Sequence, residues 1–364
     1  MIKQVSLVPY NRPDIGKEEL EAVDQVMKSG FITQGKEVEL FEKEIAQYIG
    51  CKEVICVSSG TMAMNLAYLY VIAEMKIDLE KIKVYCPATT FIASILPAFT
   101  MGLNCEFVDV DRETSLMMIE ENGIEKKLGK DGILSLVHLA GNIKHINFYH
   151  PNIIEDGCQS FGSILGGRLL GENSRLCVFS FHTGKIITSG EGGCIVTNNK
   201  DVADRIRDMR NHGQIASYVS WYKGLNGRMT NISASIGCVQ LKKIRRYIEY
   251  RRGLYNHYRS LLKSIEDIKY LSSPSDCHPI YSLFPIFTKR AKSLKDFLRT
   301  KAIEYRTFFP SMINQKVFDY KYDKKKFKNS IELEETGILL PFGNSITYEE
   351  VEYVVASIKE FYNG

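Results

Sequence analysis

The sequence predicts an α/β fold in which a large, mostly parallel, seven-stranded sheet precedes a small α+β C-terminal part. Three observations support this. Seven short apolar segments alternate with helical patterns between residues 54 and 197. Several of these segments are apolar throughout, which is typical of parallel strands that helices cover on both faces. The chain has 364 residues, a length that suits one large domain and one smaller domain.

The first part of the chain opens with an arm over residues 1–16. Helices follow where apolar residues recur with helical spacing, and Gly30 and Gly50 end the first two of these patterns. The predicted helices cover residues 17–29, 38–48 and 62 to about 75, and the seven predicted strands cover residues 54–58, 83–86, 105–109, 133–138, 152–155, 176–181 and 193–197.

The second part of the chain reads mainly as helix. One helical pattern covers residues 201–211, and a longer pattern with several lysines and arginines covers residues 231–262. We place the join between the two domains inside the longer pattern, near residue 245. The large domain then comprises residues 1–245, including the arm, and the small α+β domain comprises residues 246–364, with strand candidates at 280–288 and a final helix at 347–362.

Composition and charge argue against several classes of protein. The net charge of +4 comes from 47 basic and 43 acidic residues, a balance too mild to indicate a nucleic-acid-binding surface. No apolar run reaches the roughly 18 residues that a membrane helix needs, and no signal peptide opens the chain. The nine cysteines show no metal-ligand spacing, and His138 and His278 have no partner ligands near them in sequence. We therefore expect a cytoplasmic protein with reduced thiols and without metal, membrane or nucleic-acid partners.

One lysine follows a short apolar strand. Residues 176–181 form the strand, and His182, Lys185 and a glycine-rich run come directly after it. α/β proteins build active sites where such strands end. Burial lowers the pKa of a lysine, and the neutral amine can then form a Schiff base with an aldehyde. Taken alone, Lys185 is more simply interpreted as a solvated surface lysine.

Two further patterns change that interpretation. Asp156 stands at the end of another apolar strand, and Gln159 follows three residues later. The first strand runs through the small residues Ser59, Gly60 and Thr61 into a helix, so that backbone N–H groups at this turn can hold a phosphate. An acid at a strand end, a phosphate cradle and a lysine able to form an imine together predict pyridoxal phosphate (PLP). The acid would keep the pyridine nitrogen protonated.

With these motifs in place, the chain resembles the sugar aminotransferases of the DegT/DnrJ/EryC1/StrS family, within the fold type I, aspartate aminotransferase-like PLP enzymes. No single stretch is specific for the family. Seven stretches in the family's order are specific for it together, and the match extends over most of the chain, from about residue 8 to residues 341–358. The stretches are GFITQGKEVELFEKEIAQYIG (30–50), SSGTMA (58–63), PATTFIAS (87–94), EDGCQSFGS (155–163), SFHTGKIITSGEGG (180–193), RNHG (210–213) and GLNGRMTNISASIGCVQL (224–241).

The resemblance implies roles for the residues in these motifs. Lys185 is similar to the family's Schiff-base lysine, which afterwards moves a proton between the two reacting carbons. Asp156 is similar to the partner of the pyridine nitrogen, and Gln159 to the residue that approaches the phenolic oxygen. A helix cap is the alternative both for a strand-end aspartate and for the small-residue turn. The cofactor phosphate would be held by Gly60, Thr61 and Ser180.

Four more positions are candidates, and three of them have an alternative. Phe91 stands where the family stacks an aromatic ring on the pyridine, and a core phenylalanine is the alternative. Asn226 matches an asparagine that reaches the phosphate of a neighbouring subunit, which implies a homodimer with shared sites. Gly227 stands where the family commonly has an aromatic, which leaves the shape of this loop open. Arg228 is a candidate for an anionic substrate group or for a salt bridge, and His182 for a substrate contact or an ordinary loop position.

The resemblance also implies the reaction. An amino group moves from an amino acid, which we interpret as L-glutamate, to a keto group of a nucleotide-linked deoxysugar, which we interpret as C4, for bacterial surface glycans such as O-antigen. The nucleotide, UDP, dTDP or GDP, stays open. A PLP-dependent sugar dehydratase and another keto-sugar or cyclitol aminotransferase are alternatives. Relatives that remove a hydroxyl carry histidine in place of the Schiff-base lysine, so Lys185 argues against a dehydratase. A non-catalytic regulatory relative and a generic α/β domain are further alternatives, and the joint presence of Lys185, Asp156 and Gln159 argues against the first of these two.

Overall fold

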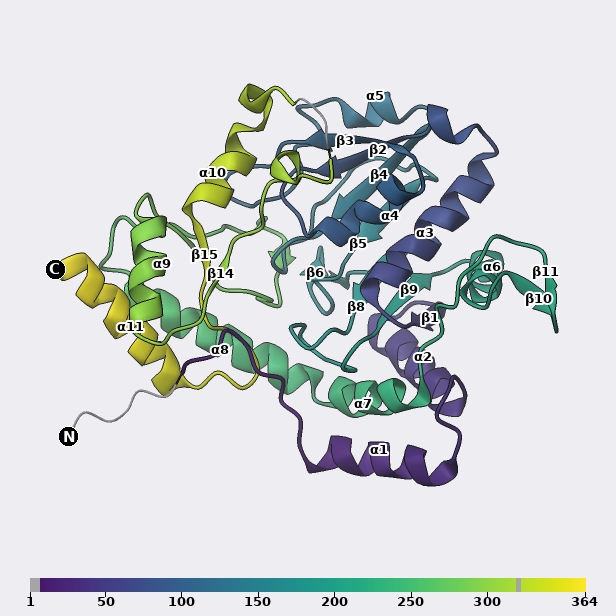
Figure 1. Cartoon of the computed structure of the whole chain (residues 1–364), viewed down its shortest axis with the longest axis horizontal. Helices are drawn as coiled ribbons and strands as arrows, with labels where there is room; N and C mark the ends of the chain where they lie inside the picture. The colour runs from purple at the N-terminus through teal and green to yellow at the C-terminus, as the bar shows by residue number, and fades with distance from the viewer. Residues whose placement is uncertain (1–6, 319–321) are drawn as a thin grey trace.

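The computed structural model describes residues 7–318 and 322–364, so residues 1–6 of the predicted arm lie outside it. A seven-stranded sheet forms its centre (Figure 1). In order across the sheet, its strands are β1 (Glu53–Val57), β9 (Gly193–Thr197), β8 (Cys177–Ser180), β5 (Ile153–Asp156), β4 (Gly132–Val137), β2 (Lys83–Pro87) and β3 (Asn104–Val108). The five strands from β8 to β3 run parallel, and β9 pairs antiparallel with both β8 and β1. The predicted mostly parallel, seven-stranded sheet is therefore confirmed.

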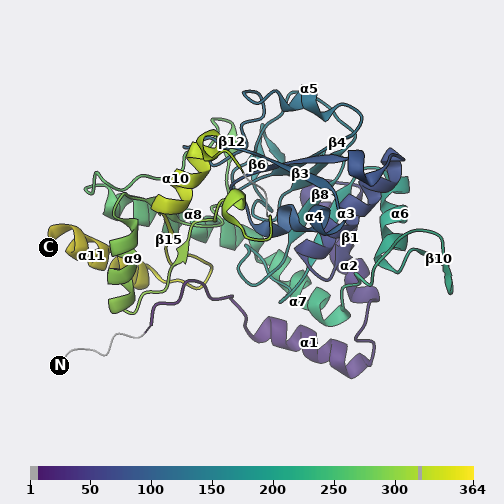
Figure 2. The same cartoon turned by 45° about the horizontal axis from the view of Figure 1, so that its top comes forward.

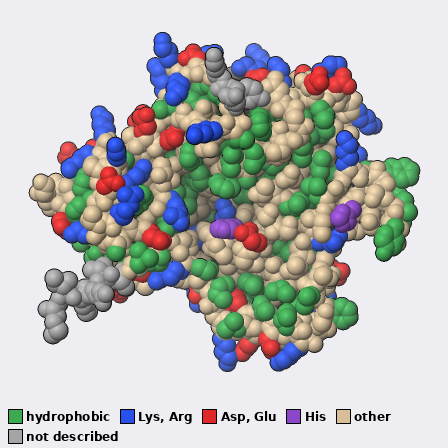
Figure 3. Space-filling view, in the orientation of Figure 1, with side chains coloured by type: hydrophobic (Ala, Val, Ile, Leu, Met, Phe, Trp, Pro, Cys, Tyr) green, Lys and Arg blue, Asp and Glu red, His purple; other side chains and the backbone are tan. Residues whose placement is uncertain are grey.

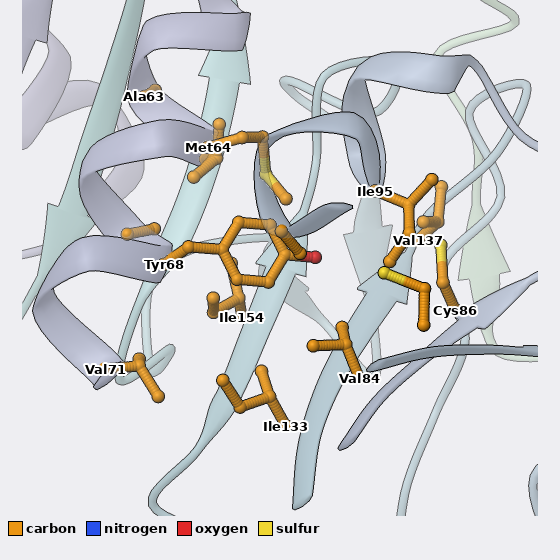
Figure 4. Packing of buried hydrophobic residues seen from close by; sticks show 14 of the residues in the cluster. Ala63, Met64, Tyr68, Val71, Val84, Cys86, Ile95, Ile133, Val137 and Ile154 are labelled. Carbon is orange, nitrogen blue, oxygen red and sulfur yellow. The ribbon is translucent and has the colours of Figure 1, made fainter. Parts of the chain in front are cut away.

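Helices cover both faces of this sheet (Figures 1 and 2). On one face, Tyr68 of α3 (Gly60–Met75) lies in a hydrophobic core with Ile133 and other strand residues (Figure 4). On the opposite face, α2 (Lys36–Ile49) buries a helical stripe that includes Phe41. Because both faces are covered, the strands carry apolar residues throughout. The other helices of this part are α1 (Lys17–Ser29), α4 (Leu96–Thr100), α5 (Ile124–Leu128), α6 (Lys200–Arg210) and α7 (Asn231–Lys242), with short 3₁₀ turns η1 (Leu79–Lys81) and η2 (Ile92–Ser94).

Three smaller sheets lie outside the central one, the third of them in the C-terminal part. β6 (Ile164–Leu165) pairs with β7 (Arg168–Leu169) and with β12 (Cys277–His278). β10 (Gln214–Ala216) and β11 (Val219–Ser220) form a hairpin that extends away from the rest of the molecule in both views (Figures 1 and 2). The hairpin therefore leaves much of its surface outside the packed body of this chain.

The C-terminal part has a hydrophobic core of its own, which includes Leu254 and Tyr258 of α8 (Ile244–Leu262). Val8 of the arm belongs to the same core, and its N–H donates to the carbonyl of Ala302 at 3.0 Å. The division of the chain near residue 245 stays a prediction. The other elements here are β13 (Pro285–Phe287), α9 (Ala291–Thr300), β14 (Arg306–Thr307), η3 (Met312–Asn314), η4 (Lys324–Phe327), α10 (Lys328–Thr336), β15 (Gly337–Leu339) and α11 (Tyr348–Asn363), with β15 between β13 and β14 in one sheet.

Two predicted elements differ from the structure. The helical pattern over residues 231–262 is two helices, α7 and α8, which Lys243 separates. The strand candidate over 280–288 is correct only for β13, because Tyr281 has φ of 49°, which lies outside the β region. The other predicted helices and strands agree with the structure to within about two residues. Among the described residues, no helix combines the length and the apolar character needed to cross a membrane.

Candidate active site

The candidate site forms where the carboxyl ends of β5 and β8 meet the N-terminus of α3. Asp156, the last residue of β5, pairs in register with Val178 of β8, and Ser180 ends β8 two residues later. Gly60 opens α3 directly beside Ser180: a Cβ added to Gly60 would lie only 2.8 Å from the Ser180 Cβ. This contact requires a glycine, because real Cβ atoms do not approach that closely. The packing brings three predicted site residues, Asp156, Ser180 and Gly60, to one edge of the sheet.

The start of α3 offers free hydrogen-bond donors. The first N–H groups of a helix have no partner inside the helix. The Ser59 hydroxyl accepts from the Met62 N–H at 3.0 Å, and the Ser59 carbonyl accepts from the next N–H. Within the described chain, the N–H groups of Gly60 and Thr61 have no acceptor, and the Ser180 hydroxyl lies beside them. Two free N–H groups, a hydroxyl and the positive end of a 16-residue helix suit a bound anion.

Asp156 is buried, with 6% of its surface exposed, and two donors fix its carboxylate. The Ser94 hydroxyl donates to Oδ2 at 2.6 Å, and the Cys158 N–H donates to Oδ1 at 3.0 Å. Ser94 is itself held, because its carbonyl accepts from the hydroxyls of Tyr68 at 2.8 Å and Ser135 at 3.1 Å. The carboxylate therefore has one orientation, which a cofactor nitrogen could use.

Lys185 lies in the loop between β8 and β9, and hydrogen bonds fix its backbone on both sides. Its N–H donates to the carbonyl of His182 at 2.9 Å, and its own carbonyl accepts from Nη2 of Arg251 at 3.0 Å. The carbonyl of the next residue, Ile186, accepts from Nδ2 of Asn344 at 2.9 Å. The C-terminal part of the chain thus holds the backbone from which the lysine side chain extends.

Electrostatics link this lysine to the aspartate. Burial raises the pKa of the Cys158 thiol well above its usual range, the nearby Asp156 carboxylate raises it further, and the Lys185 ammonium opposes the rise. Cys158 also lies 3.1 Å, at its sulfur, from the position of a Cβ on Gly60. Asp156 and the phosphate cradle therefore adjoin the same thiol, and Lys185 is near enough to act on it electrostatically.

Gln159 uses only part of its hydrogen-bonding capacity. Its Oε1 accepts from the Ala140 N–H at 3.0 Å, and the side chain is buried, with 9% exposed. Its amide NH₂ donates to no acceptor among the described residues, so a donor remains for an oxygen such as the phenolic oxygen of PLP. The predicted role of Gln159 stays a prediction that this geometry fits.

Phe91 is 58% exposed and directly precedes η2, the turn that carries Ser94. The alternative interpretation of Phe91 as a core phenylalanine is therefore wrong. Its ring is attached to the same short turn as the hydroxyl that fixes Asp156, so a ring stacked over a pyridine held at Asp156 is sterically reasonable. Stacking itself stays a prediction.

The segment around Asn226 lies beside the strand that leads to the cradle. The carbonyl of Gly227 accepts from the Ser58 N–H at 2.9 Å, and Asn226 itself is exposed. The guanidinium of Arg228 donates to the amide oxygen of Asn211, which is neutral. Arg228 therefore forms no salt bridge with the described residues. A contact of Asn226 with a second subunit stays a prediction.

His182 takes part in the loop that holds Lys185. Its Nδ1 accepts from the Gly184 N–H at 3.2 Å, and its Nε2 lies 3.9 Å from a carboxylate oxygen of Glu191. The side chain is 53% exposed, so it remains accessible to a substrate. Both of its alternatives, an ordinary loop residue and a substrate contact, remain compatible with this position.

Sequence reasoning missed three residues of this site: Ser94, Arg251 and Asn344. Ser94 lies inside the stretch PATTFIAS, but a serine gives no signal of its own. Arg251 did give a signal in the sequence. It occupies the buried stripe of α8 that Tyr247, Leu254 and Tyr258 define at helical spacing. A cation in such a stripe indicates a specific partner inside the protein.

The order of the sheet and the site at its carboxyl edge define a fold type I aminotransferase. Residues 13–359 match the model of the DegT/DnrJ/EryC1/StrS aminotransferase family, and the chain belongs to that family. The predictions of family, fold class and transaminase activity are confirmed.

Individual relatives agree with this assignment. The chain is 31% identical over 373 residues to GDP-perosamine synthase from Escherichia coli O157:H7, covering 98% of this chain and 99% of that protein. It is 30% identical over 317 residues to the UDP-4-amino-4,6-dideoxy-N-acetyl-beta-L-altrosamine transaminase of Campylobacter jejuni serotype O:23/36, covering 80% and 81% of the two chains. Among solved structures, S. venezuelae DesV in complex with a ketimine intermediate superposes with a TM-score of 0.88 at 25% identity over 98% of each chain.

Proposed function

We propose that this transaminase uses PLP to move an amino group from L-glutamate to the C4 keto group of a nucleotide-linked deoxysugar. One observation carries the cofactor proposal: the fixed carboxylate of Asp156 and the free N–H groups of the cradle meet at one sheet edge, where β8 continues into the loop that carries Lys185. The names of its relatives, which include GDP-, UDP- and dTDP-linked sugars, support a nucleotide-linked substrate. The 4-amino-4,6-dideoxy sugar in two of those names supports C4.

The residues present fit this cofactor. When bound, PLP would supply an aldehyde for an amine and an electron-withdrawing ring that stabilises negative charge on carbon. The N–H groups of Gly60 and Thr61 would hold its phosphate, with the Ser180 hydroxyl as a third donor. Asp156 would accept from the protonated pyridine nitrogen, and the free amide of Gln159 would donate to the phenolic oxygen.

Lys185 would do the chemistry that this chain contributes. Its amine would bind the cofactor aldehyde covalently until the amino acid displaces it, and it would then carry a proton from one reacting carbon to the other. The fixed backbone on both sides of Lys185 suits this work, because proton transfer needs the amine within hydrogen-bond reach of each carbon. Phe91 would lie over the ring and keep it flat.

We also propose a homodimer with shared sites. Large apolar side chains are exposed on and after α1 and on the hairpin, and apolar surface gathers in both areas (Figure 3). Contiguous apolar surface of this kind is typical of protein interfaces. A second copy on this face would cover it and would bring its own Asn226 towards the cradle. The exposed apolar residues in question are Leu20, Met27, Phe31, Ile32, Ile215, Tyr218, Val219 and Trp221.

Borohydride reduction followed by peptide mass spectrometry tests the cofactor proposal. Protein incubated with PLP should gain a reduced adduct on Lys185, and Lys185→Ala should gain none. An adduct confined to another lysine, or no uptake of PLP at all, would overturn the proposal. A panel of UDP-, dTDP- and GDP-linked 4-keto sugars with glutamate then tests the substrate. The expected product is one mass unit heavier than the keto sugar, because the oxygen is replaced by NH₂ and one hydrogen. No conversion of any panel member would refute the sugar assignment.

A further inference from the structure

Arg251 is the largest side chain that is fully buried in the described structure, with 1% of its surface exposed. Buried arginines usually face a carboxylate, because an unpaired buried charge is costly. Among the residues that the structure describes, no carboxylate contacts this one. Its three hydrogen bonds go to neutral oxygens: Oδ1 of Asn344 at 2.7 Å, the carbonyl of Ser282 at 3.1 Å and the carbonyl of Lys185 at 3.0 Å.

Burial lowers the pKa of this guanidinium to about 10, so the group is still charged at neutral pH. Within the described structure this interior cation therefore has no anion to neutralise it. Its hydrogen bonds to neutral groups, which are charge-assisted and so of the stronger kind, stabilise it together with the ring of Phe342, whose centroid lies 5.9 Å from its guanidinium. One of the three reaches the residue that we assign to the chemistry.

The partners of Arg251 come from distant parts of the chain. Ser282 and Asn344 flank strands of the C-terminal sheet, whereas Lys185 lies in the loop after β8. Asn344 is held by Arg251 and donates in turn to the carbonyl of Ile186 at 2.9 Å. Arg251 and Asn344 thus form a two-residue clamp on consecutive carbonyls of the lysine loop.

We infer that Arg251 and Asn344 position Lys185 by fixing its backbone to the C-terminal part of the chain. This inference rests on the proposed role of Lys185. A lysine that must reach two carbons in turn swings on a flexible four-carbon stem, so its accuracy depends on where its Cα is held. The clamp supplies that fixed point. Because the clamp residues belong to the C-terminal part, Lys185 is held in order only when the C-terminal core is packed.

Only arginine can perform this task at position 251. Its planar group directs five N–H donors along several fixed directions, so one side chain serves three acceptors at once. A lysine at this position carries the same charge but has a single nitrogen. Arg251→Lys should therefore keep the fold and lose the clamp, and Arg251→Met should lose both charge and donors at similar volume.

Two measurements test the clamp, and a neighbouring residue supplies the control. Tyr258 lies on the same helix, is fully buried, and donates to the Pro341 carbonyl at 2.9 Å in the segment that leads to Asn344. Tyr258→Phe therefore loosens the same region without touching the lysine loop. The variants to compare with it are Arg251→Lys, Arg251→Met and Asn344→Ala.

The first measurement is amide hydrogen exchange of the cofactor-free protein. The peptide around residues 183–190 should exchange about tenfold faster in the clamp variants than in Tyr258→Phe, because its backbone anchors are lost. The second is the single-turnover reaction of the PLP-loaded protein with glutamate. It should slow by roughly 10- to 100-fold in the clamp variants, in line with small misplacements of a reacting group.

The outcomes separate this inference from the proposed function. Faster exchange at 183–190 and a slower single turnover in the clamp variants, with both near wild type in Tyr258→Phe, support it. Exchange and turnover no different from Tyr258→Phe overturn it and leave Arg251 a structural residue. If wild-type protein gains no lysine adduct, the proposed function fails, and the exchange measurement still decides whether the clamp holds the loop. If Arg251→Met does not fold, Arg251→Lys and Asn344→Ala decide the same question.

Discussion

The hydroxyl of Ser94 donates a 2.6 Å hydrogen bond to Oδ2 of Asp156, although the two residues are 62 positions apart in the chain. With the Cys158 N–H on the other oxygen, this bond sets the direction in which the carboxylate presents itself. The orientation of Asp156, the proposed partner of the pyridine nitrogen, therefore depends on the turn η2, which a distant part of the chain provides.

Ser94→Ala should slow the half-reaction with glutamate by about tenfold, because one of two charge-assisted hydrogen bonds to Asp156 is lost. Stopped-flow absorbance of the PLP-loaded protein measures this rate. Ser135→Ala is the matched control, since the Ser135 hydroxyl donates to the Ser94 carbonyl and not to Asp156. Equal rates in the two variants would mean that the Cys158 N–H alone suffices.

Asp156→Asn keeps the size of the side chain and removes its charge. The half-reaction should fall by at least about 100-fold, since an uncharged partner no longer holds a proton on the pyridine nitrogen. Thermal unfolding should change little and PLP should still bind, which absorbance titration checks. A near-normal rate would contradict the role of Asp156.

Gly60→Ala should weaken PLP binding by about tenfold or more, because its Cβ would meet the Ser180 Cβ at 2.8 Å and push two predicted phosphate donors apart. Fluorescence titration with PLP gives the dissociation constant. In the control Gly16→Ala the new Cβ meets its nearest neighbour at 3.8 Å, so affinity should stay at the wild-type value. Unchanged affinity in Gly60→Ala would place the phosphate elsewhere.

Glu19 predicts a pH dependence of stability. Its side chain is buried, with 1% exposed, and burial acts to raise its pKa. Hydrogen bonds from Lys243, the Gly16 N–H and Gln240 outweigh this effect, so the pKa of Glu19 lies below its ordinary value of 4.5. A carboxyl whose pKa is lowered by folding stabilises the fold above its unfolded pKa, and this stabilisation is lost as the pH falls through the folded pKa. Glu19→Gln should therefore lower Tm at pH 7, and the difference from wild type should shrink below pH 4.5. A difference that is the same at pH 7 and pH 3.5 would refute this explanation.

The exposed apolar surface predicts the oligomeric state. Analytical ultracentrifugation at micromolar concentration should give about twice the 41.4 kDa of one chain. Phe31→Glu should shift the protein towards monomer and reduce its activity in parallel, because a charge would be buried in the interface. Phe31 is 74% exposed in the single chain, so the stability of the fold should be unaffected. Full activity in a monomer would contradict shared sites.

Local sequence patterns were sufficient for the central sheet. Its strands are runs of apolar residues that helices cover on both faces, so both their number and their approximate ends could be predicted. The break between α7 and α8 could not be predicted, because Lys243 is an ordinary helix former and carries no helix-ending signal in the sequence. α9 was also missed: its buried residues Ala291, Leu294 and Leu298 fit a helix, but its many charges hide so short a stripe.

The site divides in the same way. Asp156 ends a strand and Lys185 follows one, so their positions in the sequence indicated them. Ser94 and Arg251 act on them through hydrogen bonds that span 62 and 66 positions of the chain. Such contacts depend on how the whole chain folds, and one sequence without relatives beside it does not reveal them.

Val8 packs in the C-terminal core, whose other members extend from Leu254 to Ile358. During synthesis Val8 is made well before its neighbours in this core, which come from residues 254–358. The nascent chain must therefore carry this core unfinished until those residues have left the ribosome, and Val8 can pack into it only then.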